Sequence, residues 1–204
     1  GTVATATQNS ITTATGLTAV GATGTASAIA GIPFYRGDGD NTSIYTHDVS
    51  GTDSTAQGNT AYGIQAMDAI TTGDNNTAIG EQSLTSVTTG SANTAVGRLS
   101  LKTVSTGVNN IAVGYEALKA NNGDANVAIG YQALLANTTG ASNIAIGSTA
   151  LGATTTGARN IAIGSNALDL QDTENDNIAI GYNAMTTDNQ GGTQNIAIGN
   201  YAMD

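Results

Sequence analysis

The sequence predicts an all-β protein whose main part is a parallel β-solenoid (β-roll) of about nine 17-residue coils. Each coil is expected to contain two short strands, and an irregular N-terminal cap is expected before the first coil. Three observations lead to this prediction: one phrase recurs at a nearly constant interval, apolar residues alternate within it, and bulky side chains are scarce. Together they indicate one small unit stacked on itself, with each copy covering its neighbour.

The recurring phrase is written NVAIGYQAL in the copy from Asn126 to Leu134. In most copies it reads Asn, a β-branched residue, Ala, Ile or Val, Gly, two variable residues, a small residue, and Leu or Met. Nine copies follow one another in steps of 16 to 18 residues, and they begin at Asn59, Asn76, Asn93, Asn110, Asn126, Asn143, Asn160, Asn177 and Asn195. Coils stacked about 4.8 Å apart would give a solenoid roughly 43 Å long.

The first half of each copy is predicted to be a strand. Val127 and Ile129 alternate with Ala128, as side chains do on the two faces of a strand. A helix would place a glycine such as Gly130 in its interior in every copy, at a cost of about 1 kcal/mol each time. The repeat therefore favours strands over helices.

The second apolar element of each copy, Ala133-Leu134 in the same example, is predicted to be the second strand. A turn-rich segment such as residues 137–140 follows it. The glycine that ends this segment stands three residues before the next Asn, and we expect it to have a left-handed backbone conformation. These glycines are Gly73, Gly90, Gly107, Gly123, Gly140, Gly157 and Gly192, with Glu174 in their place before Asn177.

Two rows of the repeat each have two interpretations. The Asn row either forms a ladder of side-chain amides between coils or occupies a corner conformation that Asn tolerates well. The Ala row either fills the narrow interior or forms a smooth ridge at which another chain approaches. Neither interpretation of the Asn row implies catalysis.

Residues 1–58 are predicted to be an irregular cap or degenerate repeats, and residues 59–204 the solenoid domain. Asn41 begins a weaker copy 18 residues before Asn59. Terminal repeats of solenoids are commonly atypical, because an exposed end presents an unpaired edge. Since the sequence stops inside a repeat, we expect further chain or a partner after Asp204.

Composition excludes several classes of partner and chemistry. The 204 residues carry a formal charge of −10, and a polyanion repels phosphate backbones and anionic lipid, so we expect no nucleic-acid partner. No apolar run approaches the roughly 20 residues that span a bilayer, so no membrane insertion is expected. His47 lies beside Asp48 without a nucleophile motif, and the carboxylates of residues 37–42 are not followed by the glycine and the distant bidentate Glu that an EF-hand calcium loop has at fixed positions. We therefore predict no catalytic, metal-binding or cofactor-binding residue and no enzyme activity.

The motif VAIG at residues 127–130, followed after two residues by a small one, resembles the head repeat of trimeric autotransporter adhesins, and TAIGEQS at residues 77–83 is especially similar. In that family such repeats form a left-handed parallel β-roll with two strands per coil, and three chains associate side by side. The longer period here, with its Thr-Thr-Gly insert, is more similar to the repeat arrays of phage tail-fibre proteins. The resemblance covers residues 59–203.

This resemblance implies a non-enzymatic, extracellular structural or adhesive element, foremost a trimeric phage tail-fibre segment. The alternatives are a bacterial trimeric surface adhesin head and a subunit of an extracellular filament. The expected partners are two further copies of the chain and a host-surface glycan or envelope component. Six residues are candidates for surface contacts, three after the repeat glycine and three in the cap: Tyr115, Tyr131, Tyr182, Phe34, Tyr35 and Tyr45.

Overall fold

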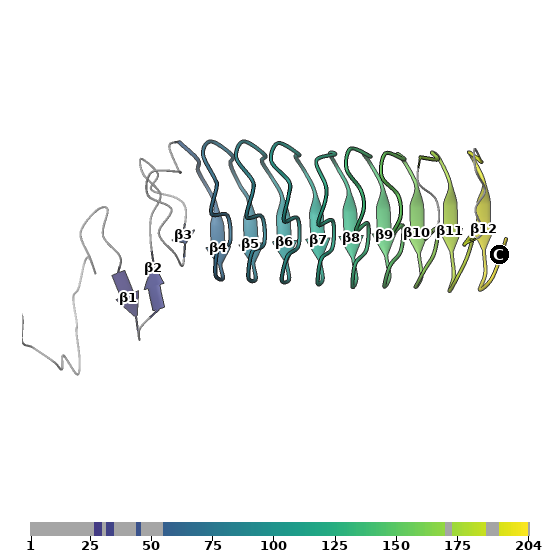
Figure 1. Cartoon of the computed structure of the whole chain (residues 1–204), viewed down its shortest axis with the longest axis horizontal. Coiled ribbons are helices and arrows are strands. Elements are labelled where there is room, and N and C mark those ends of the chain that lie inside the picture. Colours follow the sequence, from purple (N-terminus) through teal and green to yellow (C-terminus); the bar gives the residue numbers. More distant parts are fainter. Residues whose placement is uncertain are drawn as a thin grey trace, which may run out of the picture.

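A computed structural model of the chain describes residues 27–29, 32–34, 44–45, 55–169, 173–186 and 192–203. Within these residues all regular secondary structure is β. Strands β1 (Ser27–Ile29) and β2 (Ile32–Phe34) form an antiparallel pair. The other strands form one parallel sheet in the order β3 to β12, side by side along the long axis in Figure 1. They are β3 (Ile44–Tyr45), β4 (Thr60–Tyr62), β5 (Thr77–Ile79), β6 (Thr94–Val96), β7 (Ile111–Val113), β8 (Val127–Ile129), β9 (Ile144–Ile146), β10 (Ile161–Ile163), β11 (Ile178–Ile180) and β12 (Ile196–Ile198).

Each strand pairs in register with the strand one copy away. Ala128 of β8 lies opposite Ala112 of β7 on one side and Ala145 of β9 on the other. The chain therefore makes one turn for each copy of the repeat, and the predicted parallel β-solenoid is confirmed.

The second apolar segment of each coil is not a strand, so the prediction of two strands per coil is wrong. Residues 131–136 form consecutive turns, in which Gln132 and Leu134 have φ values of 54° and 51°. Alternating left-handed residues cannot continue an extended strand. The turns are nevertheless tied to both neighbouring coils, because the amide of Leu134 donates to the Ala150 carbonyl at 3.0 Å and that of Gln132 to the Tyr115 carbonyl at 2.9 Å.

The core is a narrow column of small and medium-sized side chains. The middle residue of each strand, such as Ala128, is fully buried, and so is the apolar residue of the turn segment, such as Leu134. The Ala row therefore fills the interior, and its interpretation as a ridge between chains is wrong. Alanine fits because the strand and the turn segment of a single coil enclose little space between them.

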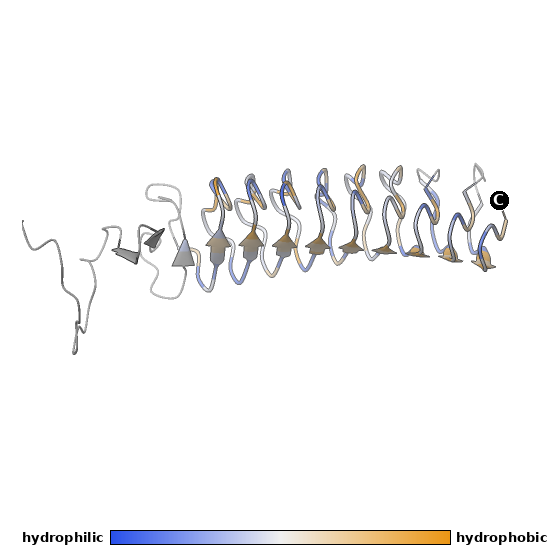
Figure 2. Ribbon diagram, turned by 90° about the horizontal axis from the view of Figure 1, so that it is seen from below, coloured by the Kyte–Doolittle hydropathy of each residue, from blue (hydrophilic) through white to orange (hydrophobic). Residues whose placement is uncertain are grey.

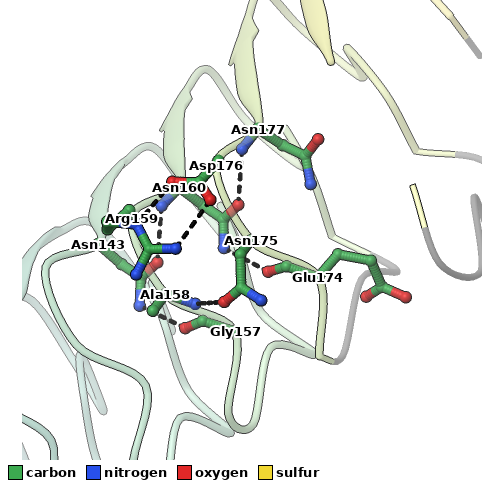
Figure 3. A network of polar contacts seen from close by, with 9 residues as sticks. All are labelled: Asn143, Gly157, Ala158, Arg159, Asn160, Glu174, Asn175, Asp176 and Asn177. Carbon is green, nitrogen blue, oxygen red and sulfur yellow. Dashed lines mark hydrogen bonds and ion pairs between the residues drawn. The ribbon is translucent and has the colours of Figure 1, made fainter. Parts of the chain in front are cut away.

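The repeated Asn residues form a ladder along this column, as Figure 3 shows for three coils, and all of them are buried except the last, Asn195. The amide N–H of Asn160 donates to Oδ1 of Asn143 at 2.9 Å, and Nδ2 of Asn143 donates to the Gly157 carbonyl at 2.8 Å. All nine repeated Asn residues are described, and none has a positive φ. The residue before each of them does, for example Ser142 at 60°. The ladder interpretation is thus confirmed and the strained-corner interpretation is wrong.

Glycine is required at two positions of the repeat, for two different structural reasons. The glycine after each strand has a φ between 128° and 141°, a region that side chains rarely adopt. The glycine three residues before the Asn is not left-handed at Gly73, Gly90, Gly107, Gly123, Gly140 or Gly157, contrary to the prediction. There a Cβ would overlap the carbonyl of the residue one coil further on, so close approach of the two backbones requires glycine.

The parallel sheet begins before Asn59. β3 pairs with β4, so that Ile44 lies opposite Thr60 and Tyr45 opposite Ala61. The weaker copy thus exists, but its register is two residues away from the alignment of Asn41 with Asn59.

Candidate functional site

The outer face of the sheet has two rows of mainly apolar side chains along the solenoid. Because the middle residue of each strand points into the core, the first and third residues point outward. The first row is Thr60, Thr77, Thr94, Ile111, Val127, Ile144, Ile161, Ile178 and Ile196, and the third-position row is Tyr62, Ile79, Val96, Val113, Ile129, Ile146, Ile163, Ile180 and Ile198. We call these two rows the outer apolar face.

The outer apolar face is substantially open to solvent. Ile129 and Ile146, in the middle of the solenoid, are 39% and 37% exposed, and Ile198 is 69% exposed. Figure 2 shows the strands in apolar colours in one line along the molecule. Parallel sheets are normally covered on both faces, and large contiguous apolar patches on a protein surface mark interaction sites. This face is therefore the strongest candidate interaction surface on the described part of the chain.

The outer apolar face changes character along the axis. In its first row, the coils of β4 to β6 present Thr60, Thr77 and Thr94, whereas every later coil presents Ile or Val. The apolar band is thus narrower at β4 to β6 and wider from β7 onward, which distinguishes the two ends of the surface.

A third row of surface side chains lies beside the outer apolar face, at the residue after each strand's glycine. Nε of Arg98 lies 3.1 Å from a carboxylate oxygen of Glu81, and the guanidinium lies 5.8 Å from the ring centroid of Tyr115. The rings of Tyr115 and Tyr131 are stacked, with centroids 5.6 Å apart and an angle of 11° between their planes. Residues on adjacent coils therefore form a continuous ladder of an acid, a cation and two aromatic rings.

Two acidic residues elsewhere on the coils, Glu116 and Asp176, are paired with cations. Nζ of Lys119 donates to Glu116 at 2.6 Å, and Gln132 donates to the other oxygen at 2.8 Å, so the pKa of the Glu116 carboxyl is lowered. Arg159 binds Asp176 through two hydrogen bonds of 2.6 and 2.8 Å, visible in Figure 3, and lowers the pKa of that carboxyl. These pairs link one coil to itself or to the next, and neither is arranged around a reacting group.

The six predicted contact residues have different outcomes. Tyr115, Tyr131 and Tyr182 lie on the surface, with exposed fractions of 38%, 52% and 44%. Tyr182 also makes an edge-to-face contact with Tyr201, at 5.4 Å between centroids. Tyr45 is fully buried at the position that Ala61 takes in the next coil, so its prediction as a surface contact is wrong. The side chain of Phe34 and all of Tyr35 lie outside the described residues.

His47 and residues 37–42 also lie outside the described residues. Among the residues that are described, no three His, Cys, Asp or Glu side chains are grouped so as to hold a metal ion. Burial raises the pKa of the Asp169 carboxyl.

Among the described residues, no helix has the length and apolarity that a membrane span requires.

Comparisons with known proteins place no relative beside this chain. No protein-family model, no curated protein and no solved structure matches it.

The sequence alone does not identify the outer apolar face as a surface. Period-two alternation separates Val127 and Ile129 from Ala128, but it does not say which side faces the core. The Asn row supplied a usable signal, because Asn126 and Ala128 share a face and the buried Asn ladder places that face inside.

Proposed function

We propose that the chain is a non-enzymatic structural and adhesive fibre element outside the cell, foremost a segment of a trimeric phage tail fibre. The observation that carries this proposal is the outer apolar face, which continues along every coil from β4 to β12. The proposal has three parts: self-association through that face, a rigid rod as the product, and attachment through side chains that stay exposed.

Self-association is supported by the chemistry of the face. Its Ile and Val side chains lie on regular strands, so a second copy can pack against them without rearrangement. Fully burying such a side chain contributes about 1.5–3 kcal/mol, so covering the fraction of Ile129 that is still exposed, 39%, contributes about 0.6–1.2 kcal/mol. Repeated over many coils, this gain is large enough to offset the cost of association.

A parallel, in-register arrangement is favoured by the change along the axis. When copies run in the same direction, the coils of Thr60, Thr77 and Thr94 in one copy contact the same coils in the next copy, and coils with Ile or Val contact coils with Ile or Val. An antiparallel pair would instead oppose threonine hydroxyls to isoleucines. Parallel copies related by a rotation axis along the rod form a closed assembly, and the resemblance to adhesin and tail-fibre repeats favours three of them.

Attachment is assigned to the row that follows the strand glycines. Stacked rings such as Tyr115 and Tyr131 offer rigid, amphipathic area to a glycan or envelope component at little entropic cost. Three copies would present each ring three times, so weak contacts would sum by avidity.

The first experiment measures the mass of the protein in native buffer. We expect three times the 20.2 kDa of one chain. A variant combining Ile144→Thr, Ile161→Thr and Ile178→Thr should shift the population toward single chains. Threonine already occupies this row in β4 to β6, so each replacement suits the strand while removing apolar contact.

The matched control is Leu135→Thr, which lies in the turn segment and not on the outer apolar face. Threonine occupies the equivalent position at Thr85, so the coil accepts it. The Leu135→Thr control should form an assembly with the same number of chains as the wild type. A monodisperse single chain for the wild type would refute self-association, and an open-ended polymer would support the filament alternative.

A second experiment separates an adhesive element from a spacer. Tyr131→Ala and Tyr182→Ala should leave the mass and the circular dichroism spectrum unchanged and weaken binding to cell envelopes or to an array of glycans. Unchanged binding would leave the chain a spacer. Hydrolysis of a host polysaccharide by the purified protein would contradict the non-enzymatic part of the proposal.

A further inference from the structure

One coil of the solenoid is a residue shorter than its neighbours. The step from Asn110 to Asn126 is 16 residues, and the missing residue belongs to the corner that precedes Asn126. Only Asn122 stands between Asn121 and Gly123, whereas two residues stand between the core position and the corner glycine in the coils that begin at Asn59, Asn76, Asn93, Asn126 and Asn143. The deletion creates the one Asn-Gly dipeptide of the whole sequence.

An Asn-Gly dipeptide can be modified covalently by an intramolecular reaction, deamidation. The backbone nitrogen of the glycine loses its proton and attacks the side-chain carbonyl carbon of the Asn. A carbon–nitrogen bond forms, ammonia leaves, and the resulting succinimide is opened by water to Asp or to isoaspartate. Glycine favours this reaction because it has no side chain to hinder the approach and its backbone turns freely.

The structure holds the attacking nitrogen in another interaction. The amide N–H of Gly123 donates to Oδ1 of Asn121 at 3.0 Å, and Nδ2 of Asn121 donates to the Gly123 carbonyl at 2.9 Å. Both residues are buried. In a coil of ordinary length the equivalent amide, that of Gly90, donates instead to the Ser105 carbonyl one coil further on, at 3.1 Å. The Asn121 side chain thus supplies the acceptor at this short corner.

The side chain that would be attacked is also held. Oδ1 of Asn122 accepts the backbone N–H of Ser105 at 2.8 Å, and the backbone N–H of Asn122 donates to the Thr138 carbonyl at 2.7 Å. These bonds tie Asn122 to the coils on both sides, although the residue itself is exposed. In the closed corner the Asn122 side chain is therefore held by the preceding coil, while the N–H of Gly123 is held by Asn121.

We propose that Asn122-Gly123 is a latent deamidation site and that Asn121 is the positioning residue that keeps it unreactive. Reaction then proceeds only from a locally opened corner. Isoaspartate would lengthen the backbone by one carbon and misplace both bonds of Asn122. The short coil would become a defined breaking point within the rod. This inference is independent of the proposed function.

The test follows deamidation of the full chain at mildly alkaline pH by proteolysis and peptide mass mapping. Wild-type protein should convert Asn122 far more slowly than the same chain unfolded in urea. Asn121→Val removes both side-chain bonds to Gly123, and also the bonds that Oδ1 accepts from Asn137 at 2.7 Å and from Asn126 at 3.4 Å. It should accelerate conversion of Asn122 roughly tenfold in the folded protein. Valine already fills this interior row at Val87 and Val104. Thr154→Val, a matched change in the same row, should leave the rate unchanged.

Two results would overturn the proposal. One is conversion of Asn122 in native wild-type protein at the rate of the unfolded chain. The other is an Asn121→Val protein that keeps the wild-type circular dichroism spectrum and also the wild-type rate. If Asn121→Val does not fold, Asn121→Thr, which reproduces the residue at Thr154, replaces it and is judged by the same comparison.

Discussion

Replacing one rung of the buried Asn ladder should destabilise the solenoid strongly. The side chain of Asn143 accepts the Asn160 amide at 2.9 Å, donates to the Gly157 carbonyl at 2.8 Å and donates to Oδ1 of Asn126 at 3.2 Å. Asn143→Ala leaves the Asn160 amide and the Gly157 carbonyl buried without these partners. At about 1–3 kcal/mol for each orphaned group, we expect a loss of about 2–6 kcal/mol in the free energy of unfolding.

The assay is urea denaturation followed by far-ultraviolet circular dichroism, at one protein concentration because association adds to apparent stability. Asn109→Ala is the matched control, since it removes an exposed amide at a position where other coils have Ala92 and Ala125. Its cost should stay below about 1 kcal/mol. Equal losses for Asn143→Ala and Asn109→Ala would refute the argument that the ladder holds the coils together.

Asn143→Asp tests the direction of the same hydrogen bonds. The new carboxylate keeps an acceptor for the Asn160 amide but faces the Gly157 carbonyl, to which the native amide donates. Burial without a cation raises the pKa of such a carboxyl. A group with a raised folded-state pKa supports folding below its unfolded pKa of about 3.9 and loses that support as pH rises. The variant should therefore be closer to wild type near pH 4 than at pH 7.

Two further predictions concern backbone strain and an ion pair. Ser142 has a φ of 60°, a conformation that costs a non-glycine residue about 1–2 kcal/mol, and Gly58 occupies the equivalent position in the first coil. Ser142→Gly should therefore raise the urea midpoint, whereas the control Ala141→Gly should lower it. The pKa of Glu116 is lowered beside Lys119, so its contribution to stability is present above the unfolded pKa and is lost as pH falls through the folded pKa. Glu116→Gln should lower the free energy of unfolding by less than about 1 kcal/mol at pH 7 and leave it unchanged at pH 2. Equal losses at both pH values would contradict the ion-pair explanation.

The sequence by itself determined the architecture of this protein. Nearly equal spacing of the nine Asn residues is enough to predict stacked coils, because a strand can pair in parallel with its own copy when each intervening loop is long enough for one turn. Loops that are one residue shorter or longer, before Asn126 and before Asn195, keep the same register. The same logic placed β4 to β12 within the phrases that contain them. It also left Tyr115, Tyr131 and Tyr182 as surface positions, since side chains vary freely only where the stacked repeat does not enclose them.

Only the tertiary structure decided which side of each strand is the inside. Val127 and Ile129 are larger and more apolar than Ala128, so alternation alone favours either arrangement, yet one coil encloses room only for alanine beside Leu134 and the Asn ladder. The conformation of the turn segment likewise could not be predicted from the local sequence, because Ala133-Leu134 has the composition of a strand. Its left-handed backbone is stabilised by hydrogen bonds to both neighbouring coils, and such bonds exist only once the coils are stacked.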